Sequence, residues 1–141
     1  MSDCTFCDIV AGRAHGHVVY SDEYVVAFLD ISPITSGHTL VVPRRHSSGL
    51  ADLDPAIGGK IFAAGQRIAA AMRVGAVAAD GVNLAMNDGR AASQTVFHSH
   101  LHVIPRHSGD KASFAKGLLT RRARDLDSVA AGLRAAIETV P

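Results

Sequence analysis

Several residue types are scarce in this sequence, and each scarcity argues against a class of protein. The chain contains 2 cysteines and no tryptophan, and only 5% of its residues are aromatic. Two cysteines are too few for the disulfide frameworks of small secreted domains. A net charge of +1 lacks the basic surplus of nucleic-acid-binding domains. We recognise no membrane-length apolar run and no signal peptide, and we therefore expect a cytoplasmic protein without membrane or nucleic-acid partners.

The chain does contain regular apolar patterns, and its 141 residues are enough for one domain with a buried core. Apolar residues spaced three or four apart predict helices, and alternating or β-branched runs predict strands. The predicted helices are Thr5–Ala11, Asp54–Val74 and Asp125–Val140, and the predicted strands are Val18–Tyr20, Tyr24–Leu29, His38–Pro43, Gly81–Met86 and Thr95–Ile104. This order has no regular strand–helix alternation, and it favours an α+β fold with a largely antiparallel sheet.

Three histidines alternate along the last predicted strand, at His98, His100 and His102. Side chains of a strand alternate between its two faces, so all three imidazoles would lie on one face. Such a row has two chemical uses. The imidazoles could bind a metal, or one could act as a nucleophile while its neighbours orient it.

The two cysteines, Cys4 and Cys7, have the spacing Cys-x-x-Cys. In a reducing compartment this spacing favours a metal site or a redox pair. No strand is predicted before the pair, as a thioredoxin-like redox motif would require. Zinc is therefore the preferred interpretation, although the pair supplies only two of four ligands. The one basic cluster, Arg121, Arg122 and Arg124, is interpreted as solvated surface in preference to a phosphate site.

The histidine segment resembles the signature of the histidine-triad (HIT) family of nucleotide hydrolases and transferases. That signature is His-x-His-x-His followed by two apolar residues, here Val103 and Ile104. Other segments resemble the family in order and spacing, namely 28–33, 37–43, 87–89 and 93–97. Two positions depart from the pattern. Ser99 is polar where an apolar residue is usual, and Ser93 stands where glycine is common before glutamine.

The resemblance implies a fold and a set of roles. It implies an α+β fold of about five antiparallel strands with a long central helix and a C-terminal helix. Within residues 1–141 the triad core would span 4–106 and a C-terminal extension 107–141. His100 would be the nucleophile that forms a nucleotidyl-histidine on a nucleoside α-phosphate, and His102 would contact the phosphate or the leaving group. Asp30 would bind the ribose, and phosphate oxygens would be bound by Asn87, Thr95 and the backbone N–H groups near Ser93 and Gln94.

An apolar slot for a purine base is implied at Phe6, Ile9, Phe28 and Ile31. From the apolar pattern alone, these four residues are ordinary core residues. A subset of the family also pairs an N-terminal Cys-x-x-Cys with two histidines. On this chain the set would be Cys4, Cys7, His46 and His98, which suits structural zinc. The family also implies a homodimer and no organic cofactor.

Several functions remain open at this point. A Hint-like enzyme would cleave purine nucleoside phosphoramidates of the AMP–lysine type, and we favour this interpretation. A Fhit-like enzyme would instead cleave dinucleoside polyphosphates such as diadenosine tri- or tetraphosphate. The triad could also bind a catalytic zinc, although Cys4 and Cys7 offer zinc a better site. The last alternative is a nucleotide-binding regulator without significant turnover.

Overall fold

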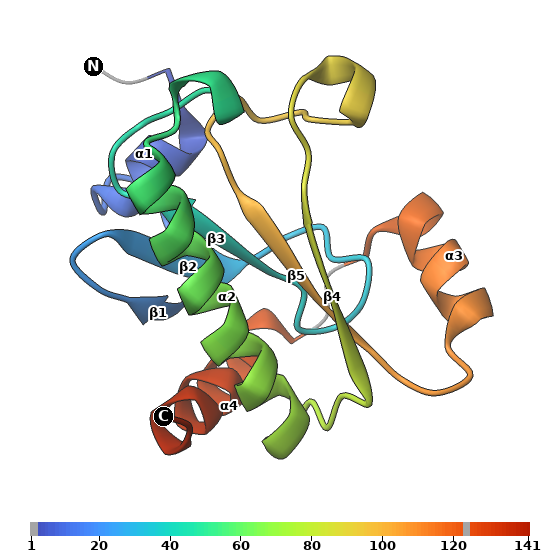
Figure 1. Ribbon diagram of the computed structural model, residues 1–141. Helices are drawn as coiled ribbons and strands as arrows, with labels where there is room; N and C mark the ends of the chain where they lie inside the picture. The colour runs from blue at the N-terminus through green and yellow to red at the C-terminus, as the bar shows by residue number, and fades with distance from the viewer. Residues whose placement is uncertain (1–2, 123–124) are drawn as a thin grey trace.

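The protein is built around one five-stranded antiparallel sheet, seen in a computed structural model that describes residues 3–122 and 125–141. The spatial order of the strands is β1-β2-β3-β5-β4, and Figure 1 shows this arrangement. The strands are β1 (Val18–Ser21), β2 (Val25–Leu29), β3 (Thr39–Pro43), β4 (Gly81–Met86) and β5 (Leu101–Arg106). The α+β prediction with about five antiparallel strands is confirmed.

Four α-helices accompany the sheet: α1 (Thr5–Val10), α2 (Pro55–Val74), α3 (Lys111–Thr120) and α4 (Leu126–Thr139). The long helix α2 begins where the sequence predicts, because the Asp54 carboxylate accepts the Ala56 N–H at 2.9 Å and Pro55 occupies the first turn. Helix α3 was not predicted. None of its residues is buried, so it lacks the apolar stripe from which a helix is recognised. Among residues 3–122 and 125–141, no helix is long and apolar enough to cross a membrane.

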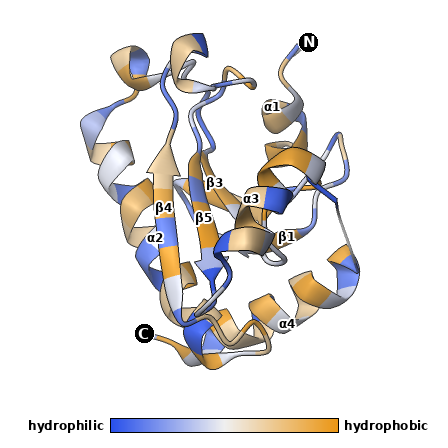
Figure 2. Cartoon of the chain, turned by 90° about the vertical axis from the view of Figure 1, so that its right-hand side faces the viewer, coloured by the Kyte–Doolittle hydropathy of each residue, from blue (hydrophilic) through white to orange (hydrophobic). Residues whose placement is uncertain are grey.

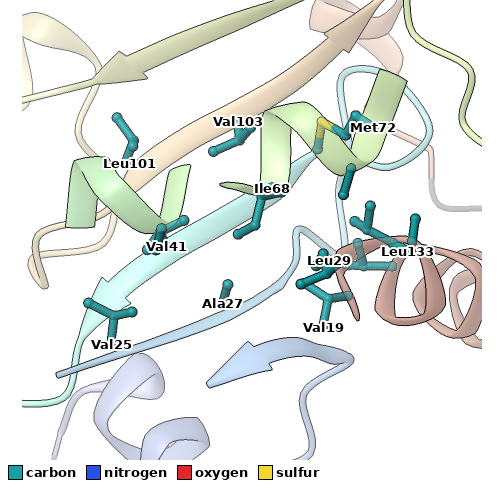
Figure 3. Packing of buried hydrophobic residues seen from close by; sticks show 14 of the residues in the cluster. Val19, Val25, Ala27, Leu29, Val41, Ile68, Met72, Leu101, Val103 and Leu133 are labelled. Atoms are coloured by element: carbon teal, nitrogen blue, oxygen red, sulfur yellow. The ribbon is translucent and has the colours of Figure 1, made fainter. Parts of the chain in front are cut away.

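Alternation along the strands divides the core into two layers. Val25, Ala27 and Leu29 of β2 face the same cluster as Leu101 and Val103 of β5. Helices α2 and α4 cover this face, and Figure 3 shows Ile68 and Met72 of α2 over the strands and Leu133 of α4 beside Leu29. The intervening residues of β2, Val26 and Phe28, point the other way into a smaller cluster that contains Phe6 of α1. The sheet therefore carries α1 on one face and α2 with α4 on the other.

The histidine segment is not one continuous strand, contrary to the prediction of a strand over Thr95–Ile104. Strand β5 begins at Leu101, so His98 and His100 precede it and only His102 lies within it. The backbone before β5 is diverted because Ser99 donates its N–H to the Ser47 carbonyl at 2.7 Å rather than to a neighbouring strand. The three imidazoles nevertheless lie on the side of the sheet that faces α1, because Phe6 contacts the rings of His98 and His100, and His102 is paired with Leu40 of the Phe6 cluster.

Candidate active site and metal centre

The segment before β5 is fixed by hydrogen bonds to two neighbouring loops. The buried hydroxyl of Ser47 donates to the Ser99 hydroxyl at 2.8 Å, which gives the unusual polar residue of the triad a polar partner. The buried side chain of Gln94 donates to the Ser48 and Val96 carbonyls, at 2.8 and 3.1 Å. A buried polar group that finds such partners stabilises a single conformation. These contacts set the positions of His98 and His100.

One hydrogen bond fixes the tautomer of His100. Its Nδ1 lies 2.8 Å from the His98 carbonyl oxygen. A carbonyl only accepts, so the proton of the neutral imidazole is on Nδ1 and the Nε2 lone pair is available. Burial lowers the pKa of His100, which favours the neutral form, although the bond to the His98 carbonyl and the charge of Asp30 oppose this shift. The ring of Phe6 packs edge-on against it with centroids 5.2 Å apart.

His102 is oriented by His38, a residue to which the sequence analysis assigned no role. The Ile34 N–H donates to Nδ1 of His38 at 3.0 Å, so the proton of a neutral His38 is on Nε2. That Nε2 lies 2.9 Å from Nδ1 of His102, which therefore accepts and carries its own proton on Nε2. Burial lowers the pKa of His38 to about 3 and that of His102 to about 4, so both imidazoles are neutral near pH 7. His38 directly precedes β3, which pairs with β5, and this pairing brings the two rings together.

Asp30 lies beside these histidines, and Arg121 reaches it from the C-terminal part of the chain. One carboxylate oxygen of Asp30 accepts the Ser32 N–H at 2.8 Å, and the other lies 3.6 Å from His38 Nε2. The Arg121 guanidinium lies 3.4 Å from that second oxygen and donates to the Ser32 carbonyl at 2.8 Å. Burial raises the pKa of Asp30, while the Ser32 N–H and the charge of Arg121 counteract the shift.

The contacts of Arg121 make it part of the candidate site, so its interpretation as solvated surface was wrong. Its neighbour Arg122 is exposed, and Arg124 lies outside the described residues. Arg121 also adopts a left-handed backbone conformation, φ 47°, at the end of α3. No motif in the sequence marks it, because its contacts with Ser32 and Asp30 depend on how α3 docks.

The four predicted base-binding residues take different environments. Phe6 and Phe28 are buried and pack against each other with ring centroids 5.2 Å apart. Ile9 is half-buried at the edge of the same cluster, and Ile31 is 68% exposed. Phe6 and Phe28 are therefore core residues in this structure, as the apolar pattern indicates, and Phe6 also contacts His100.

Some polar groups of the loop that was predicted to bind phosphate already form hydrogen bonds within the loop. Asn87 follows Met86, the last residue of β4, which pairs with Leu101. Ser93 and Thr95 are exposed. The N–H groups of Ser93 and Gln94 donate to the Arg90 and Gly89 carbonyls at 3.0 and 3.1 Å. These two N–H groups are therefore bonded within the loop, and phosphate binding by the backbone N–H groups near Ser93 and Gln94 stays a prediction.

The Ser93 backbone explains why glycine is common at this position. Ser93 has φ 71°, in the left-handed region that glycine adopts without the steric cost of a Cβ atom. It ends a 3₁₀ turn over Arg90–Ala92, which the sequence analysis did not predict.

The four predicted zinc ligands converge at one point between α1 and the segments at residues 46 and 98. One ligand atom from each of Cys4, Cys7, His46 and His98 lies within 4.8 Å of the others. Cys4 Sγ and Cys7 Sγ each lie 3.4 Å from His98 Nδ1, and His46 Nδ1 lies 3.3 Å from Cys7 Sγ and 3.2 Å from His98 Nδ1. Ligand atoms around tetrahedral zinc are about 3.3–3.8 Å apart, given bonds of roughly 2.0–2.3 Å. The cluster therefore fits zinc.

The outer contacts of His98 also fit a metal ligand. Its Nε2 lies 2.8 Å from the Pro43 carbonyl, so the proton is on Nε2 and Nδ1 faces the sulfur atoms with its lone pair. Burial lowers the pKa of His98, which favours the neutral form that a metal needs. Two sulfur and two nitrogen donors in this arrangement make a closed site of the structural kind.

Comparison with known proteins identifies the family. A family model of the HIT domain matches residues 11–109. The chain belongs to the HIT family. An uncharacterized HIT-like protein of Mycobacterium tuberculosis is 49% identical over 134 residues, which cover 95% of this chain and 92% of that protein. A zinc-bound histidine triad family protein from Mycobacterium smegmatis has a TM-score of 0.89 and 48% identity, covering 96% and 94% of the two chains.

A third relative has a named activity. The adenylylsulfatase HINT3 of Arabidopsis thaliana is 34% identical over 132 residues, which cover 94% of this chain and 66% of that protein. Family membership makes this chain a HIT nucleotide-binding protein and confirms the predicted HIT fold. The family model ends at residue 109, so one HIT domain over residues 1–141 stays a prediction.

Proposed function

We propose that this protein hydrolyses a nucleoside 5′-phosphoramidate at the α-phosphate through a nucleotidyl-His100 intermediate. The observation that carries the proposal is the 2.8 Å contact of His100 Nδ1 with the His98 carbonyl, which leaves Nε2 as the nucleophile. Because burial lowers its pKa, His100 needs no separate base to deprotonate it near pH 7.

The reaction proceeds in two displacements. Nε2 of His100 attacks phosphorus, the P–N bond of the substrate breaks, and the amine leaves with a proton from solvent. Water then attacks the phosphorus and the Nε2–P bond breaks, which releases the nucleoside monophosphate. The Nε2–H of His102, oriented by His38, donates to a phosphoryl oxygen or to the leaving atom as charge develops there.

The remaining predicted residues would bind the nucleotide. Asp30 would accept hydrogen bonds from the ribose hydroxyls, and Asn87, Ser93 and Thr95 would donate to phosphate oxygens from the end of β4 and the following loop. Gln94 supports this loop rather than contacting substrate, because its amide is already bonded. The exposed Ile31 would cover a purine base against Ile9, with Phe6 and Phe28 behind them.

Zinc bound by Cys4, Cys7, His46 and His98 would be structural in this proposal. The ion would hold the six-residue helix α1 against the sheet, and this helix carries Phe6 to the side of His100. No step of the reaction uses the metal.

We also propose a homodimer that pairs α2 and β4 of two copies. Strand β4 is at one end of the sheet order, and Phe62 of α2 is 52% exposed. Figure 2 shows that β4 is largely hydrophobic, with one hydrophilic band in the strand, and an edge strand of this kind is open to pairing with another chain. Sedimentation should give a dimer for the wild type and a monomer for Phe62→Glu.

A second candidate substrate has an anionic leaving group. Arg121 lies at Asp30, and Lys116 and Arg122 line a cavity of about 490 Å³ that Asp30 and His38 also border. Cations on this side favour a leaving sulfate or phosphate over an amine. HINT3, the relative named as an adenylylsulfatase, makes adenylyl sulfate the first choice, and a dinucleoside polyphosphate also has an anionic leaving group.

The test is a hydrolysis assay of the full-length protein with an AMP–lysine analogue, adenylyl sulfate and diadenosine polyphosphates, each with and without EDTA. We expect the highest kcat/KM for the phosphoramidate, unchanged by brief EDTA treatment. Highest kcat/KM for adenylyl sulfate or a dinucleotide would replace the proposed substrate and keep His100 as nucleophile. AMP binding without turnover of any substrate would contradict the proposal.

Arg121→Gln sharpens the choice of leaving group. For a substrate with an anionic leaving group, KM should rise about tenfold, whereas the AMP–lysine analogue should change less than about threefold. Arg73→Gln, on helix α2, is the matched control. Equal changes for both substrate types would show that Arg121 does not recognise the leaving group.

A further inference from the structure

A third group of side chains with potential metal ligands lies apart from the candidate active site and the Cys4–Cys7 cluster. It consists of His15 and His17, on the segment between α1 and β1, and Asp127, in the first turn of α4. One ligand atom from each lies within 4.8 Å of the others. His17 Nδ1 is 3.1 Å from an Asp127 carboxylate oxygen, and the two imidazole centroids are 4.7 Å apart.

The backbone that carries the two histidines is held in place. A Cβ atom on Gly16 would lie 2.6 Å from Ile9 Cγ2, so this segment passes directly over α1 and requires glycine between the two histidines. The His17 carbonyl accepts the Leu29 N–H at 3.0 Å, which fixes His17 beside β2.

Helix α4, which supplies the carboxylate, is fixed to the same region. Its Arg134 guanidinium donates to the Val18 carbonyl at 2.7 Å, one residue after His17. The three ligands therefore stand on supports that are already joined without a metal.

We propose that His15, His17 and Asp127 bind one divalent transition-metal ion, such as Zn²⁺ or Ni²⁺. Two imidazoles and a carboxylate are donors that suit these ions, whereas Mg²⁺ and Ca²⁺ prefer oxygen ligands alone. Three protein ligands leave at least one coordination position open, and the Asp127 side chain is 96% exposed, so water would fill it. The bound ion joins the segment between α1 and β1 to α4.

His15 distinguishes this site from an ordinary ion pair. A salt bridge between His17 and Asp127 accounts for the 3.1 Å contact without His15. A metal site needs all three residues. Removal of His15 therefore leaves an ion pair intact but takes away one of three metal ligands.

The experiment is a Co²⁺ titration of the full-length protein after its cysteine site has been loaded with zinc. Cobalt bound by thiolates has intense charge-transfer absorption, whereas a site of imidazoles and a carboxylate has only weak visible bands, so the spectrum identifies the site that is filled. We expect one further equivalent of Co²⁺ without thiolate absorption. His15→Ala and Asp127→Asn should each weaken this binding by about tenfold or more.

His107→Ala is the matched control, because it removes an exposed imidazole outside the cluster and should leave the affinity unchanged. Unchanged Co²⁺ affinity in His15→Ala, or no second equivalent in the wild type, would overturn the proposal. The melting temperature is an independent readout. Excess Ni²⁺ should raise it in the wild type and not in His15→Ala, since an ion that binds only the folded state stabilises that state.

Discussion

His98 and His100 stand two residues apart, and the fold leaves opposite ring nitrogens available on them. Nε2 of His98 lies 2.8 Å from the Pro43 carbonyl oxygen, so Nδ1 of His98 faces Cys4 and Cys7. Nδ1 of His100 lies 2.8 Å from the His98 carbonyl oxygen, so Nε2 of His100 has the lone pair. One carbonyl acceptor at each ring therefore determines which ring nitrogen has the lone pair, and the roles that we propose for the two residues, metal ligand and nucleophile, use these opposite nitrogens.

The largest expected effect tests the proposed nucleophile of this comparison, His100. His100→Asn should lower kcat by about 10⁴-fold or more, because no other group in the proposed site replaces Nε2. AMP affinity should change less than about tenfold, and zinc content should not change. Steady-state kinetics, calorimetry and metal analysis measure the three quantities. A near wild-type rate would refute the assigned mechanism.

Cys4→Ser tests the proposed zinc site. In the wild type, Sγ of Cys4 accepts the Cys7 N–H at the N-terminus of α1, and serine retains a helix N-cap at this position. Zinc should be lost and the free energy of unfolding should fall by about 3 kcal/mol, or roughly 10 °C in melting temperature. Turnover at low temperature should fall less than tenfold. Asp8→Asn in the same helix is the control. A loss of turnover as large as that of His100→Asn, in a folded protein, would move the metal into the chemistry.

The next prediction concerns the pH dependence set by the neutral His38–His102 pair. The pKa values of about 3 and about 4 lie below the ordinary 6.5, so the unfolded chain binds more protons in this interval. The free energy of unfolding should therefore decrease as the pH falls from about 6.5 towards 4, by at most about 1.4 kcal/mol per pH unit for each histidine.

His102→Asn should make this pH dependence shallower, because one of the two groups is then absent. Urea titrations at a series of pH values measure the slope, and the zinc cluster is common to both proteins. An unchanged slope would mean that these imidazoles do not titrate as a buried neutral pair.

The smallest effect tests the loop beside His100. Ser93→Gly should raise the free energy of unfolding by about 0.5–1 kcal/mol, because glycine removes the Cβ strain at φ 71°. Ala78→Gly, at φ 48° and outside the proposed site, is the matched control. Both variants should raise the melting temperature by about 1–3 °C. Only Ser93→Gly should change KM. An equal change of KM in Ala78→Gly would show that the loop at Ser93 has no specific part in substrate binding.

The sequence analysis predicted best the elements that local chemistry defines. The Asp54–Pro55 start of α2 and its end at Gly75 follow from capping and from the position of glycine. Strand β4 matches its predicted bounds, Gly81–Met86. The predicted bounds of β1, β2 and β3 differ from the observed bounds by one residue at most. Helix α3 and the start of β5 were missed. Helix α3 has no buried residue and therefore no apolar stripe. Before β5, the Ser99 N–H bonds to the Ser47 carbonyl, so the chain is not a strand there despite its strand-like sequence.

By itself the sequence determined the HIT family, the α+β class, and the four side chains of the Cys4, Cys7, His46 and His98 cluster, because family motifs and Cys-x-x-Cys spacing are local. Only the tertiary structure decided which ring nitrogen each histidine presents, since the carbonyls of Pro43 and His98 and the ring of His38 set these tautomers. It also brought Arg121 to Asp30 across 91 positions. Contacts of this kind depend on docking of separate elements, which no spacing along the chain encodes.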